Sequence, residues 1–393
     1  MRILILGIDG YIGWPLAMKL VSAGHEVTGV DNFYTRRRVG EVGSDSALPI
    51  HSLAKRIERM REKVGGVNIN FIRGDVSLPG VMYRAFTEAR PDVVFHLAEQ
   101  RSAPYSMIGL KQAIETMKTN VLSTLNLVYA AKDISPDVHI VKIGTMGEYG
   151  TPNIDITEGF IEIEFRGRKD TLPFPKNASS WYHWSKVHDS NNLMFANRLW
   201  NLKITDIMQG VVYGTRTEEI ERTGLYTRFD IDEVWGTALN RFIAQAVLGS
   251  PITPYGSGNQ KRGFLALEDS IRCLEIAMVN PPENGRYRVL NQFDQYYSIN
   301  YLANTVSEVY EEVTGEPTRI EHVKNPRVES EDHYYNPEHE TLYRLGYRPG
   351  SSLKDTIREM ILDLKKNKGR LESLRSVIMP RTVWVESKGL VRS

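Results

Sequence analysis

The chain has little cysteine, no long apolar run and no excess of charge, and each shortage excludes a class of protein. Cys273 is the single cysteine among 393 residues, which excludes an intrachain disulfide and a metal site built from cysteines. No stretch approaches the ~20 uninterrupted apolar residues of a membrane-spanning helix. Lysine and arginine number 49 against 48 aspartate and glutamate, a net charge of +1, so we expect no nucleic-acid-binding face. We expect a cytoplasmic protein with neither a membrane nor a nucleic-acid partner.

The first half of the chain alternates short apolar runs with longer amphipathic stretches. The runs predict buried parallel strands and the stretches predict helices. Strands and helices alternating at this spacing indicate an α/β fold, a Rossmann-type doubly wound parallel sheet. The expected strands are 2–6, 27–30, 68–73, 93–96, 139–143 and 204–208, and the expected helices are 14–23, 50–64, 79–89, 111–131 and 181–200.

The regular alternation ends after Tyr213. Residues 215–235 are polar and are expected to form a loop, and a strand at 287–290 is expected in the second half. Helices are expected at 237–248, 269–278, 298–313 and 353–365. We therefore predict a Rossmann domain over 1–214, a smaller C-terminal α/β lobe over 215–366, from which some segments return to the first domain, and a basic arm over 367–393.

A glycine motif lies between the first expected strand and the first expected helix. Gly7, Gly10 and Gly13 have the spacing Gly-x-x-Gly-x-x-Gly. Glycines at these positions allow a tight turn and let backbone N–H groups approach a pyrophosphate, which faces the positive end of the helix. The motif predicts a dinucleotide site that also includes the intervening Asp9, Tyr11 and Ile12.

Two aspartates end the next two strands and extend this site. Asp31 can accept both ribose hydroxyls of the adenosine, which favours NAD over NADP, although Arg36 and its two arginine neighbours could accommodate a 2′-phosphate. Asp75 is expected to bond the adenine amino group, and it also suits a helix N-cap. Asn32, Arg36, Val76 and Val212 complete the predicted cofactor site.

Tyr182 and Lys186 form Tyr-x-x-x-Lys at the start of an expected helix, a spacing that places both on one face. A free tyrosine, with a pKa near ~10, is a poor base, and an adjacent ammonium lowers that pKa. The pair predicts a proton-abstracting tyrosine whose lysine also holds the nicotinamide ribose. Thr145, after the fifth strand, could bond the same substrate oxygen. Asn120 is placed with the cofactor site, although for this residue taken alone the sequence favours a structural role in its helix.

These features together resemble the extended short-chain dehydrogenase/reductase family of nucleotide-sugar enzymes, which includes 4-epimerases and 4,6-dehydratases. The likeness is closer to the branch that joins sulfite to UDP-glucose, and it runs from residue 1 to about residue 384. It is carried by residues 7–11, 99–106, 144–155, 182–189, 209–214 and 325–329. The resemblance implies bound NAD, UDP-glucose and sulfite as substrates, and a homodimer. It leaves open whether sulfite arrives free or from a sulfite-donor protein.

The resemblance also implies the reaction. Tyr182 takes the proton of the C4 hydroxyl during oxidation, C5 and C6 then lose a proton and a hydroxyl, sulfite adds at C6, and C4 is reduced again. The family's dehydratases carry Asp-Glu after the threonine, whereas this chain has Met146 and Gly147, which move no proton. His183 is a candidate for that proton transfer because histidine titrates near neutral pH, and a purely structural role is the alternative.

Arg101, beyond the fourth strand, could hold sulfite, a sulfonate or a diphosphate through paired hydrogen bonds. Glu99 and Gln100 beside it could orient it or line the pocket around C6. Gln209 ends the sixth strand and could touch sugar hydroxyls. The resemblance assigns a uridine diphosphate site to the second lobe, formed by Thr237, Ala238, Leu239, Asn240, Thr253, Arg262 and Arg327.

Two other readings fit parts of the pattern. A UDP-sugar 4-epimerase or 4,6-dehydratase would share the first oxidation, but Met146 and Gly147 argue against a standard dehydratase. A nucleotide-sensing regulator would need neither Tyr182 nor Lys186.

Overall fold

The computed structural model describes residues 1–66, 68–283, 285–327 and 332–384. Its centre is a seven-stranded sheet in the order β11-β8-β5-β4-β1-β2-β3, with every neighbouring pair parallel. The predicted doubly wound parallel sheet is confirmed. From edge to edge the strands are β11 (Tyr287–Gln292), β8 (Lys203–Gln209), β5 (His139–Ile143), β4 (Val93–His96), β1 (Arg2–Leu6), β2 (Glu26–Asp31) and β3 (Ile69–Arg73).

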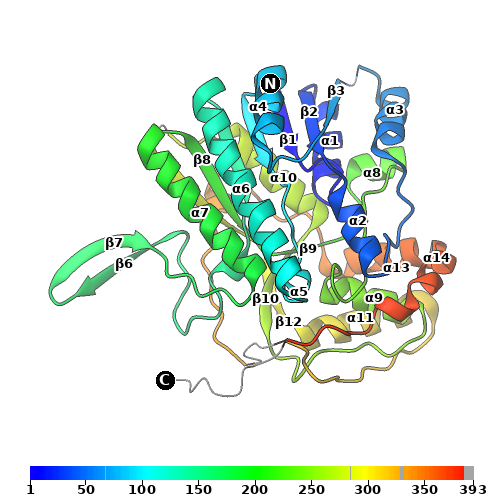
Figure 1. Ribbon diagram of the computed structural model, residues 1–393. Helices are drawn as coiled ribbons and strands as arrows, with labels where there is room; N and C mark the ends of the chain where they lie inside the picture. Colours follow the sequence, from blue (N-terminus) through cyan, green and yellow to red (C-terminus); the bar gives the residue numbers. More distant parts are fainter. Residues whose placement is uncertain (67, 284, 328–331, 385–393) are drawn as a thin grey trace.

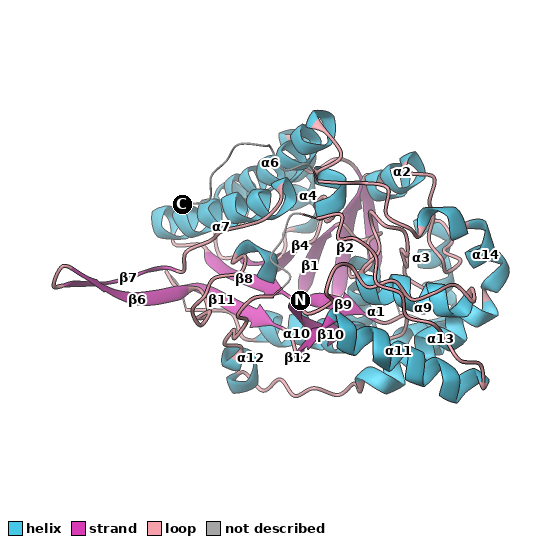
Figure 2. Ribbon diagram, turned by 90° about the horizontal axis from the view of Figure 1, so that it is seen from below, coloured by secondary structure: helices cyan, strands magenta, loops and turns pink. Residues whose placement is uncertain are grey.

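Helices cover both faces of this sheet (Figure 2). One face carries α4 (Pro79–Ala89), α6 (Leu110–Ile134) and α7 (Trp181–Trp200), and the other carries α1 (Gly13–Ser22), α3 (Leu53–Val64) and α10 (Leu267–Val279). Two short helices, α2 (Tyr34–Glu41) and α5 (Ala103–Ser106), lie near the ends of the strands. Ile3 and Ile5 face one core and Leu4 and Leu6 the other, which explains why β1 is apolar at every one of these positions.

A second lobe lies below the carboxyl ends of the strands in Figure 1. Its sheet has the order β12-β10-β9, and α9, α11 and α13 pack together around their own apolar core. The elements of this lobe are β9 (Val211–Tyr213), β10 (Lys261–Ala266), β12 (Gln295–Ser298), α9 (Ala238–Val247), α11 (Ile299–Thr314), α13 (Leu353–Lys366) and α14 (Lys368–Ser373), with the 3-10 turn η2 (Arg375–Val377). Helices α8 (Glu218–Thr223) and α12 (Glu340–Arg344) pack against the large domain, and the 3-10 turn η1 (Met146–Glu148) follows β5.

A two-stranded hairpin projects from the body of the molecule (Figures 1 and 2). It consists of β6 (Phe160–Phe165) and β7 (Arg168–Pro173), which pair antiparallel. Arg166 and Gly167 form its turn with φ of 52° and 74°, the left-handed region that tight hairpin turns require. The sequence prediction missed this hairpin and also missed helix α2.

One further expectation differs from the structure. The loop expected at 215–235 contains helix α8, which begins where the Thr217 hydroxyl accepts a hydrogen bond from the backbone of Ile220 and ends at Gly224. The strand expected at 287–290 returns to the large sheet as β11, beside β8. Val328 and Glu329, in one of the family-like stretches, and residues 385–393 of the predicted arm lie outside the described residues.

Within the described ranges, no helix is both long and apolar enough to cross a bilayer.

Candidate active site

The glycine turn lies where β1 ends, and its residues touch the neighbouring strand loop. Gly7 has φ of +91°, and a Cβ there would come within 2.8 Å of the backbone of Leu97. A Cβ on Gly13 would lie 2.1 Å from the carbonyl oxygen of Gly7. Both positions therefore require glycine, and the first turn of α1 is left open to a bound anion.

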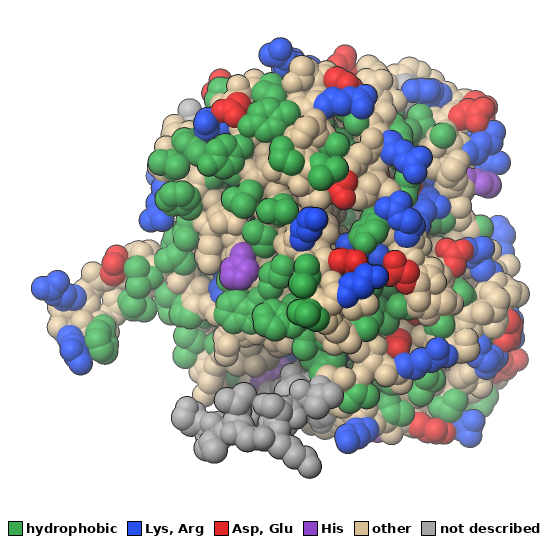
Figure 3. All heavy atoms as spheres, viewed as in Figure 1, with side chains coloured by type: hydrophobic (Ala, Val, Ile, Leu, Met, Phe, Trp, Pro, Cys, Tyr) green, Lys and Arg blue, Asp and Glu red, His purple; other side chains and the backbone are tan. Residues whose placement is uncertain are grey.

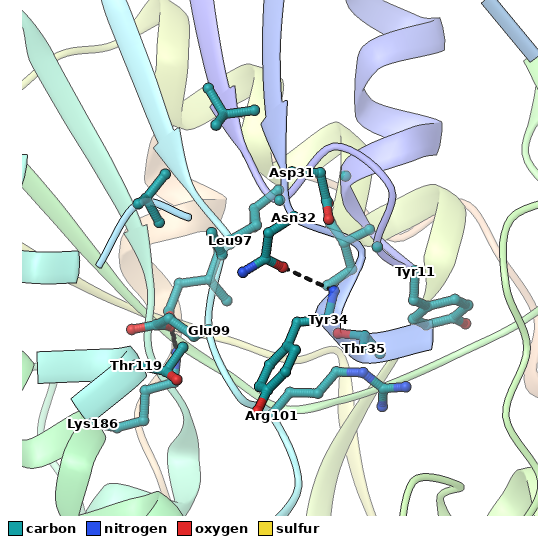
Figure 4. A pocket seen from close by; sticks show the side chains of 18 of the residues that line it. Tyr11, Asp31, Asn32, Tyr34, Thr35, Leu97, Glu99, Arg101, Thr119 and Lys186 are labelled. Carbon is teal, nitrogen blue, oxygen red and sulfur yellow. Dashed lines mark hydrogen bonds and ion pairs between the residues drawn. The ribbon is translucent and has the colours of Figure 1, made fainter. Parts of the chain in front are cut away.

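A cleft runs along the carboxyl ends of the central strands, the edge at which open α/β sheets bind ligands. The structure brings fourteen of the predicted residues to this cleft. They are Gly7, Gly10, Tyr11, Ile12, Gly13, Asp31, Asn32, Asp75, Val76, Arg101, Thr145, Tyr182, Lys186 and Gln209. Figure 4 shows Asp31 and Asn32 at one end of the cavity, and Glu99 with Lys186 at the other.

Other predicted residues are not part of the described cleft lining. From the cofactor and catalytic predictions these are Asp9, Arg36, Asn120, His183 and Val212; from the substrate predictions they are Thr237, Ala238, Leu239, Asn240, Thr253, Arg262 and Arg327. The cleft also contains residues that sequence reasoning did not assign to it, among them Tyr34, Thr35, Leu97 and Thr119. Leu97 directly follows β4, a position that could have been found from the strand prediction alone.

Asp31 is held at the adenosine end of the cleft by two backbone donors. Its carboxylate accepts hydrogen bonds from the N–H of Phe33 at 2.7 Å and of Asp9 at 2.9 Å. Burial, followed by the nearby Asp9 carboxylate, raises the pKa of Asp31 to about 6. Each carboxylate oxygen keeps a lone pair for a ribose hydroxyl.

Asp9 is engaged away from the cleft. Its carboxylate pairs with Arg36, at 2.6 Å from Nε and 2.8 Å from the second guanidinium nitrogen, and with the buried guanidinium of Arg56. Arg38, by contrast, lines the cleft and stacks 3.7 Å over the ring of Tyr34. Arg36, the arginine expected near the adenosine ribose, is therefore turned toward the glycine loop, whereas Arg38 faces the cavity.

Asn120 serves the scaffold behind the cleft. Its amide nitrogen donates to the Gln100 carbonyl at 3.0 Å and to the Ser185 hydroxyl at 2.8 Å, and its oxygen accepts from the Gln100 N–H. It thereby ties α6 to α7 and to the loop after β4, which matches the structural alternative for this residue.

Tyr182 and Thr145 meet in the cleft. Burial raises the pKa of Tyr182 to about 12, opposed first by the Lys142 ammonium and more weakly by a hydrogen bond from Thr145. The sequence led us to expect acidification by Lys186. The structure differs because the ammonium of Lys186 contacts the Glu99 carboxylate and lies 5.9 Å from the centre of the Tyr182 ring.

Thr145 is positioned by a buried carboxylate. The Thr145 hydroxyl accepts from the Gly147 N–H at 3.1 Å, and the Glu148 carboxylate accepts from the Thr145 N–H at 3.3 Å, which is a capping box. Glu148 also accepts from Ser190 at 2.9 Å and contacts the ammonium of Lys176. The Thr-x-x-Glu pattern was the sequence signal for this arrangement, and it was missed.

His183 lies beside Tyr182 with its ring bonded to the start of α7. Its Nδ1 is 2.9 Å from the Ser180 hydroxyl, and the two rings are 4.9 Å apart. Burial lowers the pKa of His183 to about 3, with smaller contributions from Arg262 and Arg327. The imidazole is therefore neutral at physiological pH and can accept a proton but has none to donate as an imidazolium.

Arg101 faces the cleft from the loop after β4. Its guanidinium contacts the Asp230 carboxylate and donates to the Trp235 carbonyl at 3.0 Å, and its side chain remains 35% exposed. Asp230 is bridged on its other side by Arg228 at 2.7 Å. Arg101 is thus fixed in direction while part of its fork stays open to an anion.

The residues predicted for the second lobe gather around α9 and the nearby loops. The Thr237 hydroxyl caps α9 by accepting from the Asn240 N–H at 3.3 Å, and Leu239 is buried in the lobe's core. The Thr253 hydroxyl accepts from Gln245 at 2.8 Å. Arg262 bonds His333 at 2.8 Å, and Arg327 lies 5.9 Å from the Trp384 ring. Ala238, beside Thr237, begins α9.

Gln209, at the end of β8, lines the cleft, and its amide nitrogen donates to Gln292 at the end of β11 at 2.7 Å and to Ser270 on α10 at 3.1 Å. Val212 pairs with Leu265 in the small sheet. Among the described residues, no group of histidine, cysteine and acidic side chains could hold a metal ion.

The chain is similar over nearly its whole length to known nucleotide-sugar enzymes. The chain is 49% identical over 385 residues to the UDP-sulfoquinovose synthase of Sulfolobus acidocaldarius, covering 98% of each. It is 45% identical to the chloroplastic UDP-sulfoquinovose synthase of Spinacia oleracea, covering 98% of this chain and 79% of the spinach protein. The structure of UDP-glucuronic acid 4-epimerase from Bacillus cereus in complex with UDP-glucuronic acid and NAD matches with a TM-score of 0.70 at 21% identity, covering 93% of this chain and 99% of that one, which is a likeness of fold. The model of the NAD dependent epimerase/dehydratase family matches residues 3–291, and the chain belongs to this family.

Proposed function

We propose that this chain is a UDP-sulfoquinovose synthase, which converts UDP-glucose and sulfite to UDP-sulfoquinovose. The observation that carries the proposal is the 49% identity to the Sulfolobus synthase over 98% of both chains. The cleft supports it, because Thr145, Tyr182 and Lys186 line the same cavity as Asp31 and the glycine turn.

NAD is the cofactor of this family; bound in the cleft, it would supply a hydride acceptor for C4 of the sugar and later a hydride donor. Gly7, Gly10 and Gly13 leave room for its pyrophosphate, and Asp31 offers acceptors to its adenosine ribose. Asp75 lines the cleft close by, but its Oδ1 already accepts from the Ser77 N–H and hydroxyl, so its other oxygen is the one that would bond adenine.

Tyr182 takes the proton of the C4 hydroxyl as that carbon is oxidised, and Thr145 hydrogen-bonds the same oxygen. The resulting ketone acidifies C5. The C5–H bond then breaks, its electron pair forms the C5–C6 double bond, and the C6 hydroxyl leaves as water after gaining a proton. The sulfur of sulfite bonds C6 while C5 regains a proton, and Tyr182 returns its proton to the C4 oxygen as that carbon is reduced.

His183 remains our proposal for the proton acceptor at C5. Its ring is neutral and offers a nitrogen lone pair, and its Nε2 lies against Gly147, where a Cβ would come within 2.4 Å of it. Met146 and Gly147 occupy the positions where the family's dehydratases carry their acid and base, and neither can exchange a proton.

Arg101 is proposed to hold the incoming sulfite. It is partly exposed in the cleft and held in place through Asp230 and Trp235. We further propose that Gln209 contacts the sugar and that Thr237 to Asn240, Thr253, Arg262 and Arg327 hold the uridine diphosphate. A separate sulfite-donor protein and a cytoplasmic location stay predictions of the sequence; the spinach relative is described as chloroplastic.

A homodimer is proposed through α6 and α7. Large apolar side chains are exposed along these adjacent helices, and Figure 3 shows hydrophobic side chains gathered over them. They are Leu110, Ile114, Leu122, Tyr129, Trp181, Phe195 and Leu199. An exposed apolar area of this kind is typical of an interface.

The test is to incubate the protein with UDP-glucose and sulfite and to weigh the nucleotide-sugar product by mass spectrometry. We expect a product that has gained the elements of sulfurous acid and lost water. A product of unchanged mass would indicate a 4-epimerase, and loss of water alone, with sulfite present, would indicate a 4,6-dehydratase; either result refutes the proposal. Tyr182→Phe is the matched control, and its product should be absent.

A further inference from the structure

Glu99 is a buried carboxylate at the catalytic end of the cleft. It follows β4 by three residues, lines the cavity, and its side chain is only 3% exposed. Within the described structure neither of its oxygens accepts a hydrogen bond; its contacts are the ion pair with Lys186 and a 3.9 Å approach to His96. A carboxylate so far removed from water needs a cation in contact, because burial otherwise penalises its charge.

The buried ammonium of Lys186, in turn, needs an anion in contact. Its side chain is 4% exposed, and its ammonium donates to the Ile143 carbonyl at 2.6 Å as well as contacting Glu99. Those two partners place the ammonium at the carboxyl end of β5, beside the Tyr182 ring. The expected partner of Glu99, Arg101, is instead paired with Asp230.

We infer that Glu99 is a positioning residue for Lys186: its carboxylate keeps the ammonium charged and fixed at the end of β5, so that Lys186 takes part in the reaction as a cation. Glu99 acts through Lys186 and exchanges no proton with the sugar. The inference rests on the proposed oxidation at C4, in which Lys186, as a cation, holds the nicotinamide ribose beside Tyr182.

Other charged groups face Lys186 from the elements packed against it. Burial lowers the pKa of Lys186 to about 8, opposed by Asp189 on α7 and Asp206 on β8. Burial also raises the pKa of Asp189 to about 6 and lowers that of His96 on β4, so His96 stays neutral. Lys142 on β5 is a second buried cation. Its ammonium lies 3.6 Å from the Asp206 carboxylate, which therefore interacts with both lysines.

Of these carboxylates, Glu99 is the one in direct contact with the ammonium, and it alone among them lines the cleft in the described chain. Removing its charge while keeping its shape should let Lys186 lose its proton at lower pH. An opposite charge at contact distance shifts a pKa by roughly 1–3 units, so we expect a downward shift of at least about one pH unit.

The experiment compares the full-length chain with Glu99→Gln and Glu99→Asp. The titration of Lys186 is followed by NMR of isotope-labelled lysine, and its signal is assigned by its loss in Lys186→Met. The rate of NADH formation on mixing with UDP-glucose, which needs no sulfite, is measured from about pH 6 to about pH 10. Glu99→Gln should move both the titration and the alkaline limb of the rate to lower pH, and Glu99→Asp should restore most of the shift.

Failure of the Glu99 inference and failure of the proposed function give different results. If Glu99→Gln lowers the rate equally at every pH and leaves the Lys186 titration in place, Glu99 has only a structural role and the inference is refuted. If the unmodified chain forms no NADH from UDP-glucose, the proposed function fails first. The NMR titration still reports on Glu99 in that case, because it requires no turnover.

Discussion

The backbone N–H of Asp9 donates a 2.9 Å hydrogen bond to the carboxylate of Asp31 and so ties the glycine turn to the end of β2. One carboxylate thus orders the loop that faces the pyrophosphate and remains available to a ribose. The same contact links the two parts of the cofactor site that were separate in the sequence.

Asp31 should make NAD binding depend on pH. Because burial raises its pKa to about 6, the carboxylate becomes protonated as pH falls through that value and loses the charge that favours ribose hydroxyls as donors. We expect the affinity for NAD to fall roughly tenfold toward acidic pH, as measured by calorimetry. Asp31→Asn should bind NAD weakly at all pH values, and a slope that persists in this variant would assign the effect to another group.

Asp9 should contribute strongly to stability. Asp9→Asn removes the partner of Arg56, whose side chain is 1% exposed, and leaves that guanidinium buried without a counter-ion. Loss of one member of a buried pair costs about 3–5 kcal/mol, so we expect a marked fall in the midpoint of denaturant unfolding. Arg36→Gln, on the more exposed side of Asp9, is the control and should cost much less. An equal loss of stability in Asp9→Asn and Arg36→Gln would contradict this prediction.

His183 should be dispensable for binding but not for turnover. His183→Ala is expected to leave NAD affinity intact and to slow product formation, by about a hundredfold if the ring accepts the C5 proton. Because burial lowers its pKa to about 3, the ring is neutral above that pH, and the native enzyme should show no acid limb from His183 near pH 6.5. Unchanged turnover in the variant would remove the residue from the mechanism.

The proposed dimer interface on α6 and α7 is tested by placing a glutamate on that surface and, as a control, a glutamate elsewhere. Leu199 lies in the last turn of α7 and is 54% exposed, and Val279 ends α10 on the opposite side of the sheet and is 59% exposed. Leu199→Glu should shift the protein from dimer to monomer in light scattering coupled to gel filtration, while Val279→Glu should not. A native chain that already runs as a monomer would refute the proposed dimer.

The strand pattern was predictable because buried parallel strands carry continuous apolar runs, as in β1, β4 and β5. The hairpin β6–β7 was missed because most of its residues are exposed, so no buried face imposes a pattern on Glu162, Glu164 or Lys169. Motif spacing predicted a shared site for the glycine turn, Asp31, Tyr182 and Lys186, and these residues line one cleft.

Side-chain pairing was not predictable from spacing. Arg36 lies five residues after Asp31, yet it turns to Asp9, because a buried carboxylate in the glycine turn competes for it. Glu99 was assigned beside Arg101 from adjacency in the chain, but residues two apart on an irregular segment need not share a partner. Which cation each carboxylate meets is decided by tertiary packing, and that information is absent from a single sequence.

Strand β11 comes after β9, β10 and α10 in the chain but completes the large sheet beside β8. Cutting the chain after residue 214 would therefore remove the edge strand of that sheet and leave one side of β8 unpaired, so we expect the first 214 residues not to fold on their own. The cleft is then built by a polypeptide that crosses between the lobes more than once. Such threading favours all-or-none unfolding, and the site should disappear in the same transition as the rest of the molecule.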